Sequence, residues 1–496
     1  MDDPDIVTEA ADTVAPGQPT SGGSAEHAVS RTSSRTRIVV AAWLCSDVVS
    51  LFGTALSSLA VPWMVLNLTH NTAATGVVSA VQLGTLVLAN LVSGPLIDRL
   101  GPTRISVFCD YTSACFIALI PLLWALHLFS IPALIAIVAV VGALRGPSNS
   151  AKSVLSPTVA QFAKQPMERI TGLSGTTERL ASTIGSAAGG VIIGLVGGPY
   201  ALAFTALGLI IGATLISFIV RPALLPLLST PQPGHGDEAG SQKTQHRTTP
   251  VQTTQAQTTQ AQTTQTEASS KQHARHMHTG LTLTHLRAGI STYMSDIADG
   301  WKSLIAIPTV FGLALIPAIT NMIDIAWTDV LAPAWVISQH HGSQTLGLLF
   351  AALTFPAIIS SLLATILASR LPRFPVFIVG YLLAGAPRYI AMAMNAPMNV
   401  VLMTMVIGGI GSGFLNPILG AVLYERMPEQ SRGKIISLTG ALTWGLMPIG
   451  SLMGGFMSHL IGLQSTLAIL GVIYFLVTMT PLAVPALRDF KRIQTP

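Results

Sequence analysis

The chain has 496 residues, of which half are hydrophobic and only 9% are Asp, Glu, Lys or Arg, whereas soluble domains carry about 25% charged residues. So few charges cannot solvate a globule of this size, which excludes a soluble protein. The formal net charge of +5 does not indicate a nucleic-acid partner, because the basic residues are spread along the edges of apolar segments.

Residues 1–37 open the chain with a composition rich in Ser, Thr, Gly and Pro. This composition predicts a disordered tail, and without a charged n-region we expect no cleaved signal peptide. Twelve apolar segments follow, each long enough for a membrane span, which needs about 20 apolar residues. The first six lie at 38–66, 74–97, 105–126, 131–151, 177–197 and 199–220, and the last six at 305–330, 345–368, 374–394, 399–421, 435–458 and 463–485.

A long linker, residues 221–302, separates the two sets of six segments. Its part at 229–280 has low complexity, with a Thr/Gln repeat and a His-rich patch at 273–278. These histidines could bind a metal ion, but we expect a solvated segment and no metal site, because nothing there fixes the ligand geometry. From 281 to 302 apolar and charged residues return, which predicts an amphipathic helix along the inner membrane surface.

Lys and Arg residues mark one side of the membrane. All 26 of them except Arg145 and Arg388 lie in the terminal segments, or in or beside the loops that follow the even-numbered spans. Cytoplasmic loops carry an excess of Lys and Arg. We therefore expect a multi-pass protein of the cell membrane with both termini and the linker in the cytoplasm.

Two stretches in different halves of the chain align without gaps, because residues 169–190 and 434–455 share eight of 22 positions. The shared block is GSxxGG, whose glycines are Gly185, Gly189, Gly190, Gly450, Gly454 and Gly455. Small residues four positions apart let another helix approach closely, so we expect these glycines to pack helices. Both copies run from the cytoplasmic side, so the repeat is parallel. The predicted fold is an all-α polytopic membrane protein, with twelve transmembrane helices in two six-helix halves at 38–220 and 303–487 and a cytoplasmic tail at 488–496.

Polar residues concentrate in spans 1, 4, 7 and 10. They are Asp47, Ser50 and Thr54 in the first, Arg145 and Asn149 in the fourth, Asn321, Asp324 and Thr328 in the seventh, and Ser412 and Asn416 in the tenth. Because polar side chains are costly in lipid, we expect them to line an aqueous path that holds the substrate.

Charged residues within the spans have several possible roles. An intramembrane carboxylate can carry a proton, which makes Asp47 and Asp324 the proton-coupling candidates, with Glu178 next in line. The alternatives are a structural ion pair and a wetted cavity wall. Arg145 could hold Asp47, bind an anionic substrate or snorkel inward, and we expect Arg388 to snorkel outward.

The loop after the second span, GPLIDRLGPTR at 94–104, resembles the signature of the major facilitator superfamily. The matching residues are Gly94, Asp98, Arg99, Gly101 and Arg104. The glycines of span 5 are similar to the antiporter motif of that family. The segments HLRAGISTYMSDIADGWKSLIAIPTV at 285–310 and ERMPEQSRGKIISLTGAL at 425–442 resemble the branch that contains macrolide-efflux and siderophore-export proteins.

This resemblance implies a drug/proton antiporter whose spans 1, 4, 7 and 10 line a central cavity. It also implies a cytoplasmic gate at the loop 94–104, in which Asp98 faces the start of span 11 near Lys434. Such a latch would hold the two halves together on the cytoplasmic side.

Motifs of common enzymes are absent, since the sequence contains no GxxxxGK[ST] and no HExxH. We therefore expect neither an ATPase nor another enzyme, no cofactor, and no disulfide or metal role for the three cysteines. The leading hypothesis is a monomeric, proton-coupled exporter of small amphipathic compounds (drugs, macrolides or siderophores) that works by alternating access. Its expected partners are a small-molecule substrate, protons and the lipid bilayer, and no nucleic acid. The alternatives are a lipid or metabolite carrier, including an uptake carrier, and a non-transporting sensor or scaffold, which would not need Asp47 or Arg145.

Overall fold

The computed structural model describes residues 22–228, 300–367, 371–428, 432–488 and 490. Twelve helices within these ranges are long and apolar enough to cross a membrane. Each overlaps one of the segments predicted from the sequence, so the twelve-helix fold is confirmed. The Thr/Gln-rich part of the linker and most of the predicted amphipathic helix lie outside the described residues.

The first half of the chain forms six spans. Its helices are α1 (Gly22–Thr69), α2 (Thr72–Leu100), α3 (Pro102–Ala125), α4 (Ile131–Ala163), α5 (Met167–Val196) and α6 (Gly198–Leu215), and the sixth span continues through the π-helical segment η1 (Ile216–Val220) into α7 (Arg221–Leu228). The side chain of Asn71 begins α2 by accepting hydrogen bonds from the backbone N–H groups of Ala73 and Ala74, which are otherwise unpaired at a helix start.

The second half repeats this plan with more interruptions. Its helices are α10 (Pro308–Ala326), which continues through the π-helical segment η3 (Trp327–Leu331) into α11 (Ala332–Ser338), then α12 (Ser343–Leu367), α13 (Arg373–Ala384) with α14 (Ala386–Ala393), α15 (Met398–Arg426), α16 (Arg432–Gly445) with α17 (Met447–Ile461), and α18 (Leu463–Ala483). Gly197 and Gly462 make the turns into α6 and α18 with φ of 85° and 86°, a conformation that favours glycine. The same turn therefore recurs at the same place in both halves.

Several helices extend beyond the apolar segments that predicted them. The fourth span was expected to end at 151, but α4 continues to Ala163, and α11 carries the seventh span to Ser338. Similarly, α1 begins at Gly22, inside the segment 1–37 that composition assigned to a disordered tail. Apolar runs mark only the part of a helix that lies in hydrocarbon, whereas the backbone hydrogen bonds continue into the polar region.

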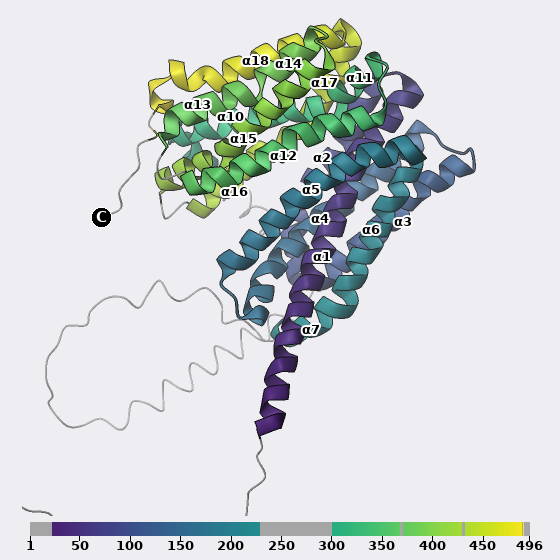
Figure 1. Cartoon of the computed structure of the whole chain (residues 1–496), viewed down its shortest axis with the longest axis vertical. Helices are drawn as coiled ribbons and strands as arrows, with labels where there is room; N and C mark the ends of the chain where they lie inside the picture. The colour runs from purple at the N-terminus through teal and green to yellow at the C-terminus, as the bar shows by residue number, and fades with distance from the viewer. Residues whose placement is uncertain (1–21, 229–299, 368–370, 429–431, 489, 491–496) are drawn as a thin grey trace, which may run out of the picture.

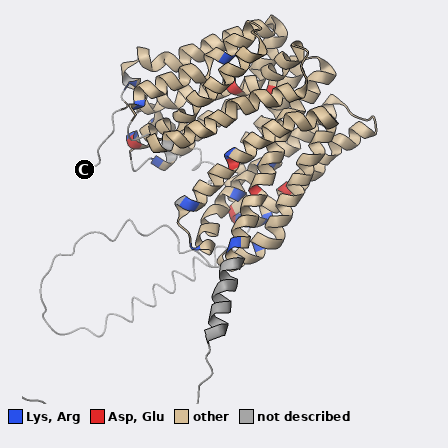
Figure 2. Cartoon of the chain, viewed as in Figure 1, with Lys and Arg blue, Asp and Glu red and all other residues tan. Residues whose placement is uncertain are grey.

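The outer faces of the helices are apolar and exposed. In an apolar 18-residue stretch of each of the twelve spans, only 28–56% of the residues are buried by the protein itself. Side chains such as Leu195, Phe218 and Leu460 are exposed. Apolar surface of this extent requires lipid rather than water around it. Figure 2 shows few charged residues along the spans, with Lys and Arg gathering toward the ends at which the halves diverge. The chain is a multi-pass membrane protein.

The two halves meet at one end of the molecule and diverge toward the other (Figure 1). At the closed end α2 packs against α17, and α5 packs against α12. Two equivalent hydrogen bonds join these pairs: Thr72 Oγ1 donates to the carbonyl of Gly455 at 3.1 Å, and Ser343 Oγ donates to the carbonyl of Gly190 at 3.0 Å. The contact between the halves therefore follows the internal repeat.

Candidate functional site

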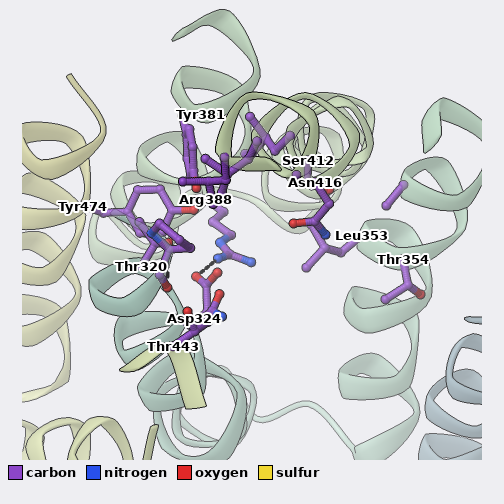
Figure 3. A pocket seen from close by; sticks show the side chains of 18 of the residues that line it. Thr320, Asp324, Leu353, Thr354, Tyr381, Arg388, Ser412, Asn416, Thr443 and Tyr474 are labelled. Carbon is purple, nitrogen blue, oxygen red and sulfur yellow. Dashed lines mark hydrogen bonds and ion pairs between the residues drawn. The ribbon is translucent and has the colours of Figure 1, made fainter. Parts of the chain in front are cut away.

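A cavity of about 490 Å³ lies within the second half of the chain (Figure 3). This volume falls in the range of small-molecule sites, about 300–1,000 Å³. Its polar wall includes four residues expected to line the substrate path, Asn321, Asp324, Ser412 and Asn416. Thr320, Thr354, Tyr381, Thr439, Thr443 and Tyr474 add further polar groups, and the leucines at 353, 415, 419 and 423 add apolar surface.

An ion pair forms one side of this cavity. Arg388 of α14 donates a hydrogen bond to Oδ1 of Asp324 on α10, and the hydroxyl of Tyr389 lies 3.1 Å from the same oxygen. The Arg388 guanidinium also lies over the rings of Trp327 and Tyr389, at 4.8 and 5.0 Å from their centroids, where cation–π attraction holds it. Arg388 is thus fixed from several sides.

The position of Arg388 corrects the expectation that it snorkels outward. The side chain is 5% exposed and points inward, because a carboxylate and two aromatic rings satisfy its charge within the protein. Asp324 remains 35% exposed. The carboxylate, rather than the guanidinium, is therefore the charge that the cavity presents to a ligand.

The first half contains a second buried polar cluster. Asp110 of α3 is 3% exposed, and it forms a salt bridge of 2.8 Å with Lys152 of α4 and accepts a hydrogen bond of 2.6 Å from Ser148. Lys152 also donates to the hydroxyl of Ser50 at 2.8 Å. Sequence reasoning missed this pair, although an acid inside the third predicted span is itself a signal of a polar partner.

The other expected cavity residues of the first half lie on α1 and α4. Asp47 is half-buried, and its Oδ2 lies 3.5 Å from the hydroxyl of Ser174 on α5. Arg145 is buried and donates to the hydroxyl of Thr54, so it does not hold Asp47 in this conformation. Asn149 is exposed on α4. In the second half, Thr328 is not part of the cavity wall, and its hydroxyl donates to the carbonyl of Asp324 at 2.8 Å.

The expected cytoplasmic gate lies at the end where the halves diverge. The side chains of Asp98, Arg99 and Arg104 are exposed, and Gly101 turns the chain into α3 with φ of 85°. Asp98 forms no salt bridge or hydrogen bond with any side chain in the described ranges. A Cβ on Gly94 would meet nothing within 4 Å. The side chain of Lys434 lies outside the described residues, so the expected latch stays a prediction.

The glycines of the repeated GSxxGG block lie at close helix contacts. A Cβ added to Gly190 would lie 2.6 Å from the Cα of Gly347 on α12, and one added to Gly455 would lie 2.9 Å from the Cα of Gly76 on α2. The glycines at 185 and 189 face α1, and those at 450 and 454 face α10 in the same manner. Both copies of the block thus bring α5 and α17 close to two helices each.

The sequence profile of the Major Facilitator Superfamily matches residues 43–327 and 314–492 of the chain. The chain is similar to the multidrug efflux pump Tap of Mycobacterium tuberculosis, with 23% identity over 449 residues that cover 90% of this chain and 93% of the relative. It is also similar to the pump of the same name from Mycolicibacterium fortuitum, with 22% identity over 451 residues that cover 90% and 95%.

Solved structures of transporters have the same fold. The peptide transporter POT in complex with sulfate superposes with a TM-score of 0.64 at 13% identity, over 92% of this chain and 96% of that structure. The nucleoside transporter NupG superposes with a TM-score of 0.54 at 14% identity, over 90% and 98%.

Proposed function

Because the chain belongs to the Major Facilitator Superfamily, we propose that it exports small amphipathic compounds by proton-coupled alternating access. The chain is a transporter and not an enzyme, as its relatives and structural neighbours are transporters. Export of several chemical classes is the activity that the name of the multidrug efflux pumps suggests. The observation that carries the proposal is the cavity with polar and apolar lining residues and a partly exposed carboxylate.

Alternating access supplies the motion that this proposal needs. The halves contact each other through α2 with α17 and α5 with α12, and they diverge at the opposite end (Figure 1). In the orientation expected from the Lys and Arg distribution, the open end faces the cytoplasm. The described conformation is then the one that admits a substrate from the cell interior.

The cavity favours an amphipathic cation or a neutral compound with hydrogen-bond donors. Asp324 offers a partly exposed carboxylate, while the guanidinium of Arg388 is enclosed and its charge is paired with Asp324. The rings of Tyr381 and Tyr474 and nearby leucine side chains offer apolar contact. A flat, positively charged organic molecule can use both the carboxylate and the aromatic surface.

Proton coupling in this proposal is assigned first to Asp47. This acid is half-buried on α1 and forms no salt bridge with a residue that the structure describes. It can therefore change its charge without breaking an ion pair. Asp324 has a cation partner in Arg388, and we assign it to substrate binding.

A susceptibility and dye-retention panel tests the export function. Cells that produce the chain should retain less of a fluorescent lipophilic cation and tolerate more of several amphipathic drugs than cells that produce the Asp324→Asn variant at equal membrane abundance. Equal retention and equal susceptibility of the two strains for every compound would contradict the assignment of this cavity to export.

A further inference from the structure

A second acid of the seventh span lies in the contact between the halves rather than in the cavity. Asp329 belongs to the π-helical segment η3, and its side chain is buried, with the residue 7% exposed. Its Oδ2 accepts a hydrogen bond of 2.8 Å from Ser451 of α17, and η3 also packs against α2, on which Ser79 is buried. Because α2 belongs to the first half, η3 lies in the closed contact between the halves.

Among the residues that the structure describes, the surroundings of Asp329 provide hydroxyl groups but no cation. Five elements pack against η3, namely α1, α2, α10, α11 and α17. Their described titratable or charged side chains are Arg37, Cys45 and Asp47 on α1, Asp98 and Arg99 on α2, Asp324 on α10 and His459 on α17, with none on α11. None of them forms a salt bridge with Asp329, and the arginine at 388 is engaged by Asp324.

An ionised carboxylate without a cation is costly to bury, whereas the neutral acid can stay buried with hydroxyl partners. The closed contact therefore suits the protonated form of Asp329. When α2 and α17 separate, the first half moves away from η3 and water reaches the carboxyl group, which suits the ionised form. A single group thus distinguishes the closed and open forms of this contact. The π-helical turn that carries it is a feature found often at functional sites.

We propose that Asp329 is the proton-binding site of the outer gate, defined here as the contacts of α2 with α17 and of α5 with α12. Its carboxyl group binds a proton when the gate closes and releases the proton when the gate opens. By linkage, a higher proton concentration then favours the closed gate. The proposal rests on the alternating access of the proposed function, but not on the identity of the substrate.

A cysteine at the other helix pair of the gate reports its opening without disturbing Asp329. Ser343 of α12 is 3% exposed and contacts Gly190 of α5, so Ser343→Cys replaces a buried hydroxyl by a thiol of similar shape. The native cysteines at 45, 109 and 115 are replaced by alanine. The purified full chain in liposomes is labelled from the gate side with a membrane-impermeant maleimide between pH 5.5 and 8.5. Rates are divided by those of an always-exposed cysteine, because only the thiolate reacts.

The corrected labelling rate should rise with pH by on the order of tenfold when Asp329 is present. Asp329→Asn, which keeps the shape of the neutral acid, should give a low rate that does not change with pH. His459→Gln is the matched control, because it removes a titratable group of α17 and should keep the pH dependence. A pH dependence that persists in Asp329→Asn overturns the proposal, and so does a rate that follows Na⁺ concentration instead of pH.

A second variant keeps the test decisive if Asp329→Asn does not fold. Ser451→Ala retains the acid but removes the hydroxyl that donates to Oδ2 of Asp329. Because α17 and η3 belong to the same half, this donor is lost in both forms of the gate, which disfavours the ionised acid, so the midpoint of the labelling curve should move to higher pH. An unchanged midpoint in Ser451→Ala also overturns the proposal. The two proposals can fail separately. If the gate depends on pH but the protein exports nothing, only the exporter function is contradicted. If export is at the wild-type rate but the gate does not depend on pH, only the role of Asp329 is contradicted.

Discussion

Gly76 of α2 and Gly455 of α17 touch through their backbones, since a Cβ on Gly455 would lie 2.9 Å from the Cα of Gly76 and 2.7 Å from the carbonyl oxygen of Thr72. The two helices belong to different halves of the chain. Gly190 and Gly347 form the corresponding contact between α5 and α12. Each of the two equivalent contacts, α2 with α17 and α5 with α12, therefore contains one pair of glycines, and these pairs set how closely the halves can approach at the closed end.

Gly455→Ala should open this contact. The added methyl group meets backbone atoms that cannot move independently, and overpacking of this kind costs about 1–3 kcal/mol. A cost of about 2 kcal/mol to the closed conformation shifts the ratio of closed to open molecules by roughly 30-fold. The labelling of the Ser343→Cys reporter should rise accordingly. Gly440→Ala on α16 is the control, because a Cβ there meets nothing within 4 Å. Equal labelling of the two variants would show that the glycine contact does not set the gate.

The Asp324–Arg388 pair should be asymmetric in its response to mutation. Arg388→Ala leaves the partly exposed carboxylate of Asp324 without its cation, which costs about 3 kcal/mol of stability, at the low end of the usual range. Asp324→Asn keeps a hydrogen-bond acceptor but leaves the enclosed guanidinium of Arg388 without its anion, so it should also lose stability. Only Asp324→Asn removes the charge that attracts an organic cation, and it should weaken binding of that cation by about tenfold, whereas Arg388→Ala should not weaken it. Thermal unfolding and equilibrium binding in detergent measure the two effects. Equal losses of cation binding in both variants would contradict this account.

Asp47→Asn should abolish proton-driven export while sparing substrate binding. The amide mimics the neutral acid permanently, so the group can no longer exchange a proton between the two conformations. Export under a proton gradient and dye binding without one are measured on the same preparation. Gradient-driven export at the wild-type rate would remove Asp47 from the mechanism and direct attention to Asp324 or Glu178.

Asp98→Asn should slow transport by about fivefold or more without loss of folded protein in the membrane, because the expected latch at the divergent end biases the two conformations. Because Asp98 is exposed in the described conformation, the substitution should leave the thermal stability of the protein unchanged. Transport and cysteine accessibility on both faces are compared with wild type. If neither changes, the latch has no role.

The sequence predicted the fold because membrane spans leave long apolar runs, and the GSxxGG repeat predicted the symmetry. It also predicted that Asn321 of span 7 and Ser412 and Asn416 of span 10 line an aqueous path, because polar side chains are costly in lipid, and the three residues line one cavity. The partners of charged residues were not predicted in the same way. Periodicity identifies the face on which Arg388 or Asp110 lies, but not that α14 brings Arg388 to Asp324 or that α4 brings Lys152 to Asp110.

Hydropathy also failed to predict where some helices end. The predicted fourth span ended at 151, one residue before Lys152, although α4 continues past this residue and buries it against α3. Two glycines of the closed contact, Gly76 and Gly347, lie outside both the GSxxGG block and the loop signature at 94–104. Their role appears only when the helices from both halves are placed against each other.

The most direct test of proton-coupled export uses inside-out vesicles that contain the purified chain and an acidic lumen. An amphipathic organic cation should accumulate in the lumen of vesicles with the wild-type protein, and a protonophore should abolish this accumulation. Vesicles with Asp47→Asn should not accumulate the cation. Accumulation that ignores the proton gradient, or that is identical in wild type and Asp47→Asn, would contradict the account.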